Sequence, residues 1–146
     1  MGKRSRNKGA GGEREFARLL FDHLGVLVVR NLNQTRSGGF DLLPASDEAD
    51  PVAEVLRGMA IEVKRHAAVA PAHLEHFWRQ TARQAEATGK VPVLVYRENR
   101  RPWRVVVPLH LLNPDIHPGQ ELPWCAELSV EGFCAMVREL ERRDHG

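Results

Sequence analysis

Residues 59–64 constrain the fold most, because they place two charges in and beside an apolar stretch. Such a stretch predicts a buried strand, on which successive side chains point to opposite faces. Glu62 and Lys64 then share one face, and Ile61 and Val63 share the other. Charges in a buried strand need a functional or structural reason. The alternative is an edge strand on which Glu62 and Lys64 face water.

A second carboxylate, Asp41, lies in another short apolar segment, which Pro44 ends. Asp41, Glu62 and Lys64 together form an Asp…Glu-x-Lys array. Metal-assisted hydrolysis of a phosphodiester needs carboxylates to hold a hard divalent cation, which acidifies a water molecule. It also needs a lysine to support the developing negative charge. The array therefore predicts a site of this kind.

Length and composition indicate one domain. A chain of 146 residues that is 42% hydrophobic can bury a core of its own. No apolar run is long enough for a membrane span, and the N-terminus lacks the core of a signal peptide. Cys125 and Cys134 lack metal-ligand spacing, which favours buried thiols in a reducing cytosol. We therefore expect a cytoplasmic protein.

The charge is distributed unevenly along the chain. The net charge is only +2, but residues 1–40 and 64–104 are basic, whereas residues 41–63 are acidic. Most of the cations are arginines, which bind phosphate in a bidentate manner. A basic surface around an acidic pocket suits an enzyme that cuts a polyanion, although solvated surface charge explains the pattern as well. The glycine-rich residues 1–12 predict a flexible DNA-binding arm with four cations: Lys3, Arg4, Arg6 and Lys8.

Hydrophobic periodicity predicts three helices and five strands. The helices cover residues 13–24, 72–88 and 129–142, and the strands cover 26–29, 40–43, 59–64, 91–96 and 103–107. Residues 45–58 form an acidic insert without a clear period, and residues 108–128 are mostly loop. Trp78 has the spacing of a core residue. The order of elements predicts an α/β fold with a mixed central β-sheet flanked by helices, in one domain over residues 13–146.

Several short motifs resemble those of the archaeal Holliday junction resolvases. They are Lys8-Gly9, Glu13-Arg14-Glu15, Val28-Val29-Arg30, Ser37-Gly38-Gly39, Asp41 and Ile61-Glu62-Val63-Lys64. Phage-encoded relatives are more similar, through Phe77-Trp78-Arg79-Gln80 and Arg101-Pro102-Trp103-Arg104. Both groups belong to the PD-(D/E)xK nuclease superfamily. The resemblance implies a restriction-endonuclease-like core.

The resemblance also implies roles for individual residues. The catalytic set would be Glu13, Asp41, Glu62 and Lys64. The three carboxylates would bind Mg²⁺, with Mn²⁺ able to substitute. Further DNA contacts are expected at Arg14, Arg30, Arg36, Ser37, Gln80 and Gln84. An exposed helix face explains the two glutamines equally well.

The function expected from the resemblance is the resolution of four-way DNA junctions by paired symmetric nicks, in DNA recombination and repair. A phage-encoded enzyme would act in the host cytoplasm, without a small-molecule cofactor. A homodimer is expected, because such a junction needs two symmetric cuts. Apolar surface on residues 77–85 and 93–96 could form the dimer contact, or could all be core. The alternatives are a related nuclease for another form of DNA and a DNA-binding protein without catalysis.

Overall fold

A six-stranded mixed sheet forms the centre of the protein. The computed structural model describes residues 3–32 and 39–145, with side chains over residues 11–32 and 39–144. The strands follow one another across the sheet in chain order, and β3–β4 is the parallel pair among antiparallel ones. They are β1 (Val28–Arg30), β2 (Leu42–Pro44), β3 (Met59–His66), β4 (Val91–Glu98), β5 (Arg104–Pro108) and β6 (Cys125–Ser129). The predicted mixed central sheet flanked by helices is confirmed.

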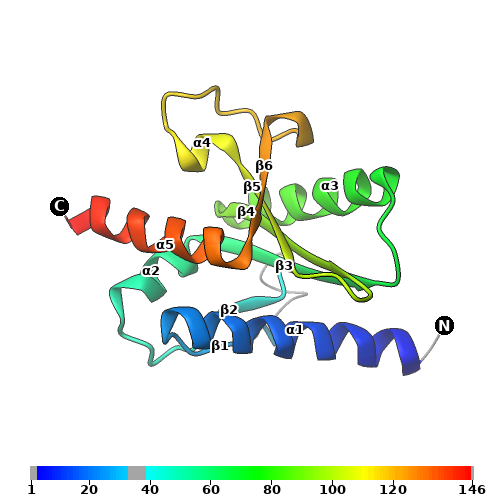
Figure 1. The fold of residues 1–146 in the computed structure, drawn as a ribbon. Coiled ribbons are helices and arrows are strands. Elements are labelled where there is room, and N and C mark those ends of the chain that lie inside the picture. Colours follow the sequence, from blue (N-terminus) through cyan, green and yellow to red (C-terminus); the bar gives the residue numbers. More distant parts are fainter. Residues whose placement is uncertain (1–2, 33–38, 146) are drawn as a thin grey trace.

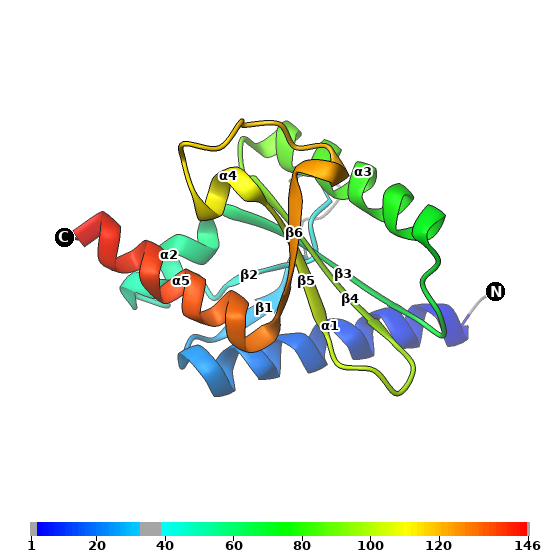
Figure 2. The same ribbon diagram turned by 45° about the horizontal axis from the view of Figure 1, so that its top comes forward.

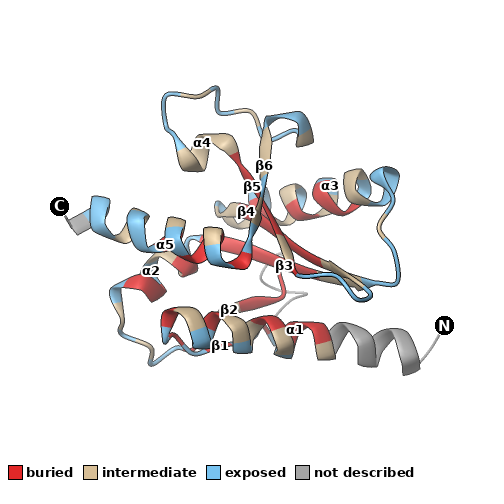
Figure 3. Ribbon diagram, in the orientation of Figure 1, coloured by how far each residue is buried: buried red, intermediate tan, exposed pale blue. Residues whose placement is uncertain are grey.

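Helices cover both faces of this sheet (Figures 1 and 2). One face packs against α1 (Lys3–Leu24), α2 (Pro51–Arg57) and α5 (Val130–His145), which together bury the larger apolar cluster. The other face packs against α3 (Pro71–Thr88). Figure 3 shows that the buried residues concentrate on the strands and on the inner sides of these helices. No helix in the described part of the chain is long and apolar enough to cross a bilayer.

Strand β3 pairs very differently with its two neighbours in the sheet. It pairs along its whole length with β4, from Met59 opposite Val91 to His66 opposite Glu98. Its other neighbour, β2, pairs with it only through Leu42 and Ile61. The half of β3 that follows Ile61 therefore has no strand on that side. The backbone groups of β3 on that side can therefore bond to polar groups from other elements.

The first helix is longer than predicted. It begins at Lys3 instead of Glu13, so the backbone of the segment expected to form a flexible arm is helical from residue 3. The side chains of the four expected DNA contacts there lie outside the described residues. The glycines in residues 1–12 are the reason why the sequence pattern placed the start of this helix too late. A Cβ added to Gly12 would lie 3.4 Å from Arg65 Cβ and 3.5 Å from the Trp103 ring, so this part of α1 packs on the sheet at ordinary van der Waals distance.

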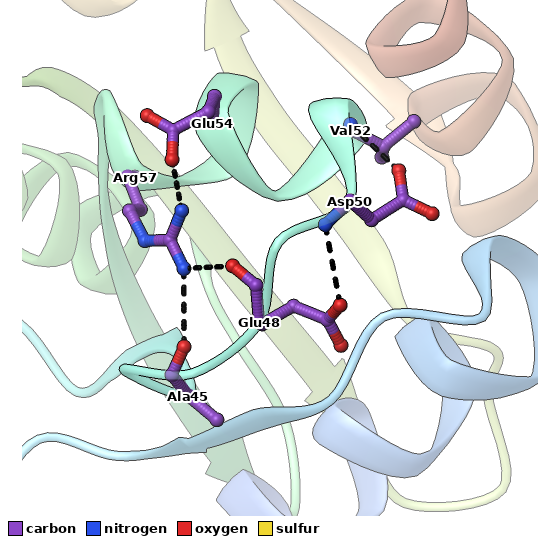
Figure 4. Close-up of polar contacts among 6 residues, drawn as sticks. All are labelled: Ala45, Glu48, Asp50, Val52, Glu54 and Arg57. Atoms are coloured by element: carbon purple, nitrogen blue, oxygen red, sulfur yellow. Dashed lines mark hydrogen bonds and ion pairs between the residues drawn. The ribbon is translucent and has the colours of Figure 1, made fainter.

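The acidic insert contains a helix that the sequence pattern did not reveal. Asp50 caps α2 by accepting the Val52 amide hydrogen at 2.8 Å, and Pro51 takes the first helical position, where its missing N–H costs nothing. Arg57 closes the segment by donating to the carbonyl oxygens of Ala45 at 3.1 Å and Glu48 at 2.5 Å (Figure 4). The insert thus contains a short, capped helix beside β2.

The C-terminal region also holds more structure than expected. The segment predicted as loop contains α4 (Leu109–Leu112), a 3-10 turn η1 (Leu122–Trp124) and β6. Strand β6 pairs with β5 at the sheet edge and is only half-buried, so it lacks the apolar run that marks a core strand. The predicted cap of the last helix is confirmed, because Ser129 Oγ accepts the Gly132 amide hydrogen at 3.0 Å.

The apolar surface on residues 77–85 and 93–96, for which a dimer contact and a core were both considered, is core. Phe77, Trp78 and Ala85 of α3 and the inner residues of β4 are buried within the chain. The prediction that Trp78 is a core residue is confirmed at 2% exposure. Both cysteines are free thiols, as predicted, although Cys125 is half-buried.

Candidate active site

Strand β3 carries the two charged groups of the array on the face that packs against α3. Glu62 is 5% exposed, whereas the Lys64 side chain is 21% exposed. The Lys64 ammonium lies 3.4 Å from Glu62 Oε1. The alternative of an edge strand with both charges in water is therefore wrong, because β3 lies between β2 and β4 and buries Glu62.

Asp41 reaches the same strand from the residue before β2. Its amide donates to the Ile61 carbonyl at 2.8 Å, and its Oδ2 accepts the Val63 amide hydrogen at 2.8 Å. The carboxylate thus takes the place of a neighbouring strand in the gap beside β3. Asn31 braces this turn, because its amide donates to the Asp41 carbonyl at 2.8 Å and its side chain to the Phe40 carbonyl at 3.0 Å.

Burial of two acids so close together raises the pKa of both. The pKa of Glu62 rises to about 8, chiefly through burial and then through the charge of Asp41. The pKa of Asp41 rises to about 6, again chiefly through burial; the hydrogen bond from Val63 opposes the rise and the charge of Glu13 adds to it. Two desolvated acids with raised pKa values and an ammonium beside them are typical of a catalytic site.

Glu13 lies near the Asp41–Glu62 pair, but its carboxylate bonds to Arg30. Its Oε2 accepts a hydrogen bond from Arg30 Nε at 2.5 Å, and the side chain is 9% exposed. Across the described residues, no three His, Cys, Asp or Glu side chains are arranged to hold a metal ion. The expected cluster of Glu13, Asp41 and Glu62 is thus not formed in this structure. The reason is that the Arg30 guanidinium attracts the carboxylate of Glu13.

The Asp41–Glu62 pair nevertheless has the chemistry that a divalent cation requires. Glu62 Oε2 is buried and has no hydrogen-bond partner. A buried carboxylate oxygen without a partner is costly unless a proton or a cation satisfies it. Carboxylate oxygens are also the ligands that Mg²⁺ and Mn²⁺ prefer. The residues present therefore fit such an ion.

The raised pKa values predict that the site destabilises the protein at alkaline pH when no divalent cation is bound. In the unfolded chain both carboxyls lose their protons near pH 4, whereas in the folded protein they keep them to about pH 6 and 8. The folded state thus binds more protons between about pH 5 and 8, and its stability falls as pH rises through that range. Glu62→Gln should be about 1–3 kcal/mol more stable than wild type at pH 8.

Urea unfolding at pH 5 and pH 8 in EDTA measures this effect. Glu139→Gln is the control, because Glu139 is half-exposed on α5 and should leave the pH dependence unchanged. Equal stability of wild type and Glu62→Gln at pH 8 would show that Glu62 carries no buried charge.

The other residues predicted to contact DNA are spread around this site. Arg14 is exposed on α1, and Arg30 is exposed where it pairs with Glu13. Gln84 packs on Gly39, close before Asp41: a Cβ on that glycine, whose φ is +86°, would lie 3.1 Å from Gln84 Nε2. Gln80 lies one turn away and lines a surface pocket of about 390 Å³ with His76, Arg83 and Gln84. Arg36 and Ser37 lie outside the described residues.

Two groups near the site were missed by the sequence reading. The Phe77 ring lies under Lys64, with the ammonium 5.4 Å from the ring centroid, and His66 stacks on the same ring. On the other face, the Glu15 carboxylate accepts hydrogen bonds from Arg97 and from Trp103 Nε1. The period of two on β3 places His66 on the face of Lys64, and could have identified it. No local signal could have identified the partners of Glu15, because they lie far along the chain.

A match to a protein family agrees with this geometry. Residues 4–121 match the family described as "Phage putative PDDEXK endonuclease". Among solved structures, the chain is similar to Hjc, a Holliday junction resolvase of the archaeal hyperthermophile Archaeoglobus fulgidus, at 16% identity over 84% of each chain with a TM-score of 0.43. No curated protein matches the sequence significantly. With the family match spanning most of its length and the Asp41–Glu62–Lys64 array at its centre, the chain belongs to the family of phage PD-(D/E)xK endonucleases.

Proposed function

We propose that this nuclease is a divalent-metal-dependent endonuclease that resolves four-way DNA junctions by paired nicks, in phage DNA recombination or repair in the host cytoplasm. The observation that carries the catalytic part is the buried Asp41–Glu62 pair with Lys64 beside it. The preference for junctions is supported by the motifs shared with the resolvases. Nothing in the array itself selects a form of DNA, because site and fold do not fix the substrate.

Each residue of the site has a distinct task in this proposal. Asp41 and Glu62 hold the cation, and Glu13 can join them if Arg30 releases it. A bound Mg²⁺ supplies Lewis-acid charge and lowers the pKa of its water. Lys64 supports the negative charge that develops on the phosphate oxygens, because its ammonium stays beside Glu62 in a half-buried position where such a charge is poorly solvated.

Incubation of the protein with matched DNA substrates in Mg²⁺ tests this function. Four-way, three-way, flap and linear duplex DNA of one sequence should be compared with and without EDTA. We expect cleavage of the four-way junction about tenfold or more above the linear duplex, and none in EDTA. Equal cleavage of all forms would favour a general nuclease. Binding without cleavage in any divalent metal would favour a DNA-binding protein without catalysis.

The proposal includes a homodimer, and the exposed apolar residues suggest where the two copies meet. Phe21 is 50% exposed on α1, and Leu27 and Val29 are 51% and 40% exposed at the edge strand β1. Apolar side chains beside an unpaired strand edge favour association with another chain. A two-fold contact there would present two identical sites to a two-fold junction.

Leu27→Glu should therefore shift the protein from dimer to monomer. The added charge would be desolvated twice in a two-fold contact, which should weaken the dimer by about 100-fold or more. Light scattering on the eluting protein should give twice the 16.5 kDa chain mass for wild type and the chain mass for the variant. Trp124→Gln is the control, because Trp124 is also exposed, at 42%, but lies beside β6. A wild-type monomer that still resolves a junction would refute the dimer.

A further inference from the structure

Strand β3 continues past Lys64 with a third functional side chain on the same face. Glu62, Lys64 and His66 alternate along the strand with residues that face the main core. Glu62 is buried, Lys64 is half-buried and His66 is exposed. The three side chains thus lead from the deepest part of the site to solvent.

One buried aromatic ring holds the outer two of these side chains. The Phe77 ring of α3 is 9% exposed. The imidazole of His66 stacks on it with 4.9 Å between ring centroids and 28° between ring planes, and the Lys64 ammonium lies 5.4 Å from the same centroid. Phe77 therefore fixes the position of His66 relative to Lys64.

Two more imidazoles surround the same ring. His73 and His76, on the first turns of α3, lie 6.4 Å and 6.2 Å from Phe77 between ring centroids. The chain has seven histidines, so three of them gather at one residue beside the catalytic lysine. His73 Nδ1 accepts the Ala70 amide hydrogen at 3.2 Å, which places the proton of the neutral ring on Nε2. We call His66, His73 and His76 the histidine cluster.

The chemistry of the histidine cluster favours an anion. The described residues provide no group of three His, Cys, Asp or Glu with the geometry of a metal site, so the cluster is not arranged as one. Glu98 lies opposite His66 in register on β4, and its Oε2 accepts the Val69 amide hydrogen at 2.8 Å. A histidine ring has two nitrogens, so His66 can face a carboxylate with one and a phosphate with the other. Imidazole N–H groups beside a lysine form good donors to phosphate oxygens.

We propose that His66 binds the DNA phosphate next to the one that Lys64 faces, with His73 and His76 lining the same path. Two residues along a strand advance about 6.6 Å, which is close to one nucleotide step of a sugar–phosphate backbone. The strand thus spaces the backbone positions of Lys64 and His66 by about one nucleotide step, and both side chains reach the Phe77 ring. The inference rests on the proposed function for its DNA substrate. It assigns His66 as a substrate-positioning contact outside the Asp–Glu–Lys array.

Binding measurements in a background that cannot cut test this assignment. Glu62→Gln protein is titrated with a four-way junction, whose branch point fixes the register, and the anisotropy of a fluorescent label gives the Kd. Adding His66→Ala should weaken binding about tenfold, because a hydrogen bond to a charged group is lost. His66→Gln, which keeps an N–H donor, should recover part of that loss. His117→Ala is the matched control, since His117 is also exposed and its ring lies against an aromatic ring, that of Trp124, with 5.0 Å between ring centroids.

Neutral methylphosphonates then locate the contact. Replacing one junction phosphate at a time, we expect one position at which the substitution weakens binding and His66→Ala adds no further loss. Lys64→Ala should couple in the same way to the adjacent phosphate. If His66→Ala binds like His117→Ala, or couples to no phosphate, the inference is wrong. If the protein binds linear duplex as well as it binds the junction, the proposed function fails, and the comparison of His66→Ala with His117→Ala on duplex still decides the role of His66.

Discussion

Replacing Glu62 by Gln, or Asp41 by Asn, should reduce DNA cleavage in Mg²⁺ by about 10³-fold or more. Each change removes one carboxylate charge from a buried pair that is 5% and 7% exposed. DNA binding should survive and could tighten, because an acid close to a phosphate is lost. Single-turnover cleavage of a labelled junction measures the rate, and anisotropy measures binding.

Glu62→Gln and Asp41→Asn are informative because they remove a charge without changing the size of the side chain. Gln and Asn keep the size of the native side chains, so the hydrogen bond from Val63 to the side-chain oxygen at position 41 can be retained. Glu127→Gln is a control on β6, where the carboxylate pairs with Arg104 at 3.3 Å, away from Asp41. Near-normal cleavage by either Glu62→Gln or Asp41→Asn would end the assignment of this pair as the metal-binding site.

Lys64→Ala should also reduce cleavage by about 10²–10³-fold, while leaving the affinity for the metal nearly unchanged. An ammonium does not ligate a cation, so its loss affects the developing charge and not the ion. Calorimetric titration of Mn²⁺ into Lys64→Ala and Glu62→Gln separates the two roles. The Glu62 variant should lose heat of binding and the lysine variant should keep it.

Lys90→Ala is the matched control for this experiment. Lys90 also places its ammonium over an aromatic ring, 4.4 Å from the centroid of Phe40, but on the loop that precedes β4. Loss of this cation should leave cleavage within about twofold of wild type. The opposite pattern of metal binding, with loss in Lys64→Ala and retention in Glu62→Gln, would reverse the assigned roles.

Local patterns in the sequence were sufficient for the elements at the centre of the fold. The apolar run of β3 marks a buried strand, and the period of 3.6 in α3 marks a helix with one buried side. Both elements were therefore located within a few residues. The stop at Gly89 follows from its left-handed conformation, with φ at +68°. The same local reasoning placed Glu62 and Lys64 on one face of a strand.

Elements that depend on distant partners were missed or misplaced. Gly12 favours a break in a helix. The sequence does not show that the ring of Trp103, far along the chain, lies against this residue. Strand β6 has no core period because only its pairing with β5 makes it a strand. Helix α2 is short, and Arg57 stabilises the segment before it through contacts with carbonyl groups that carry no sequence signal.

The amino-acid sequence by itself determined the chemical character of the candidate site: carboxylates beside a lysine, with Glu62 and Lys64 on one face of β3. Only the tertiary structure decided their environment. It buried Glu62 and Asp41 against each other and turned Glu13 toward Arg30. It also brought Phe77 beneath Lys64 and His66. The reason is physical: the alternation of side chains is a property of each strand, whereas burial, charge pairing and stacking arise only when separate elements pack together.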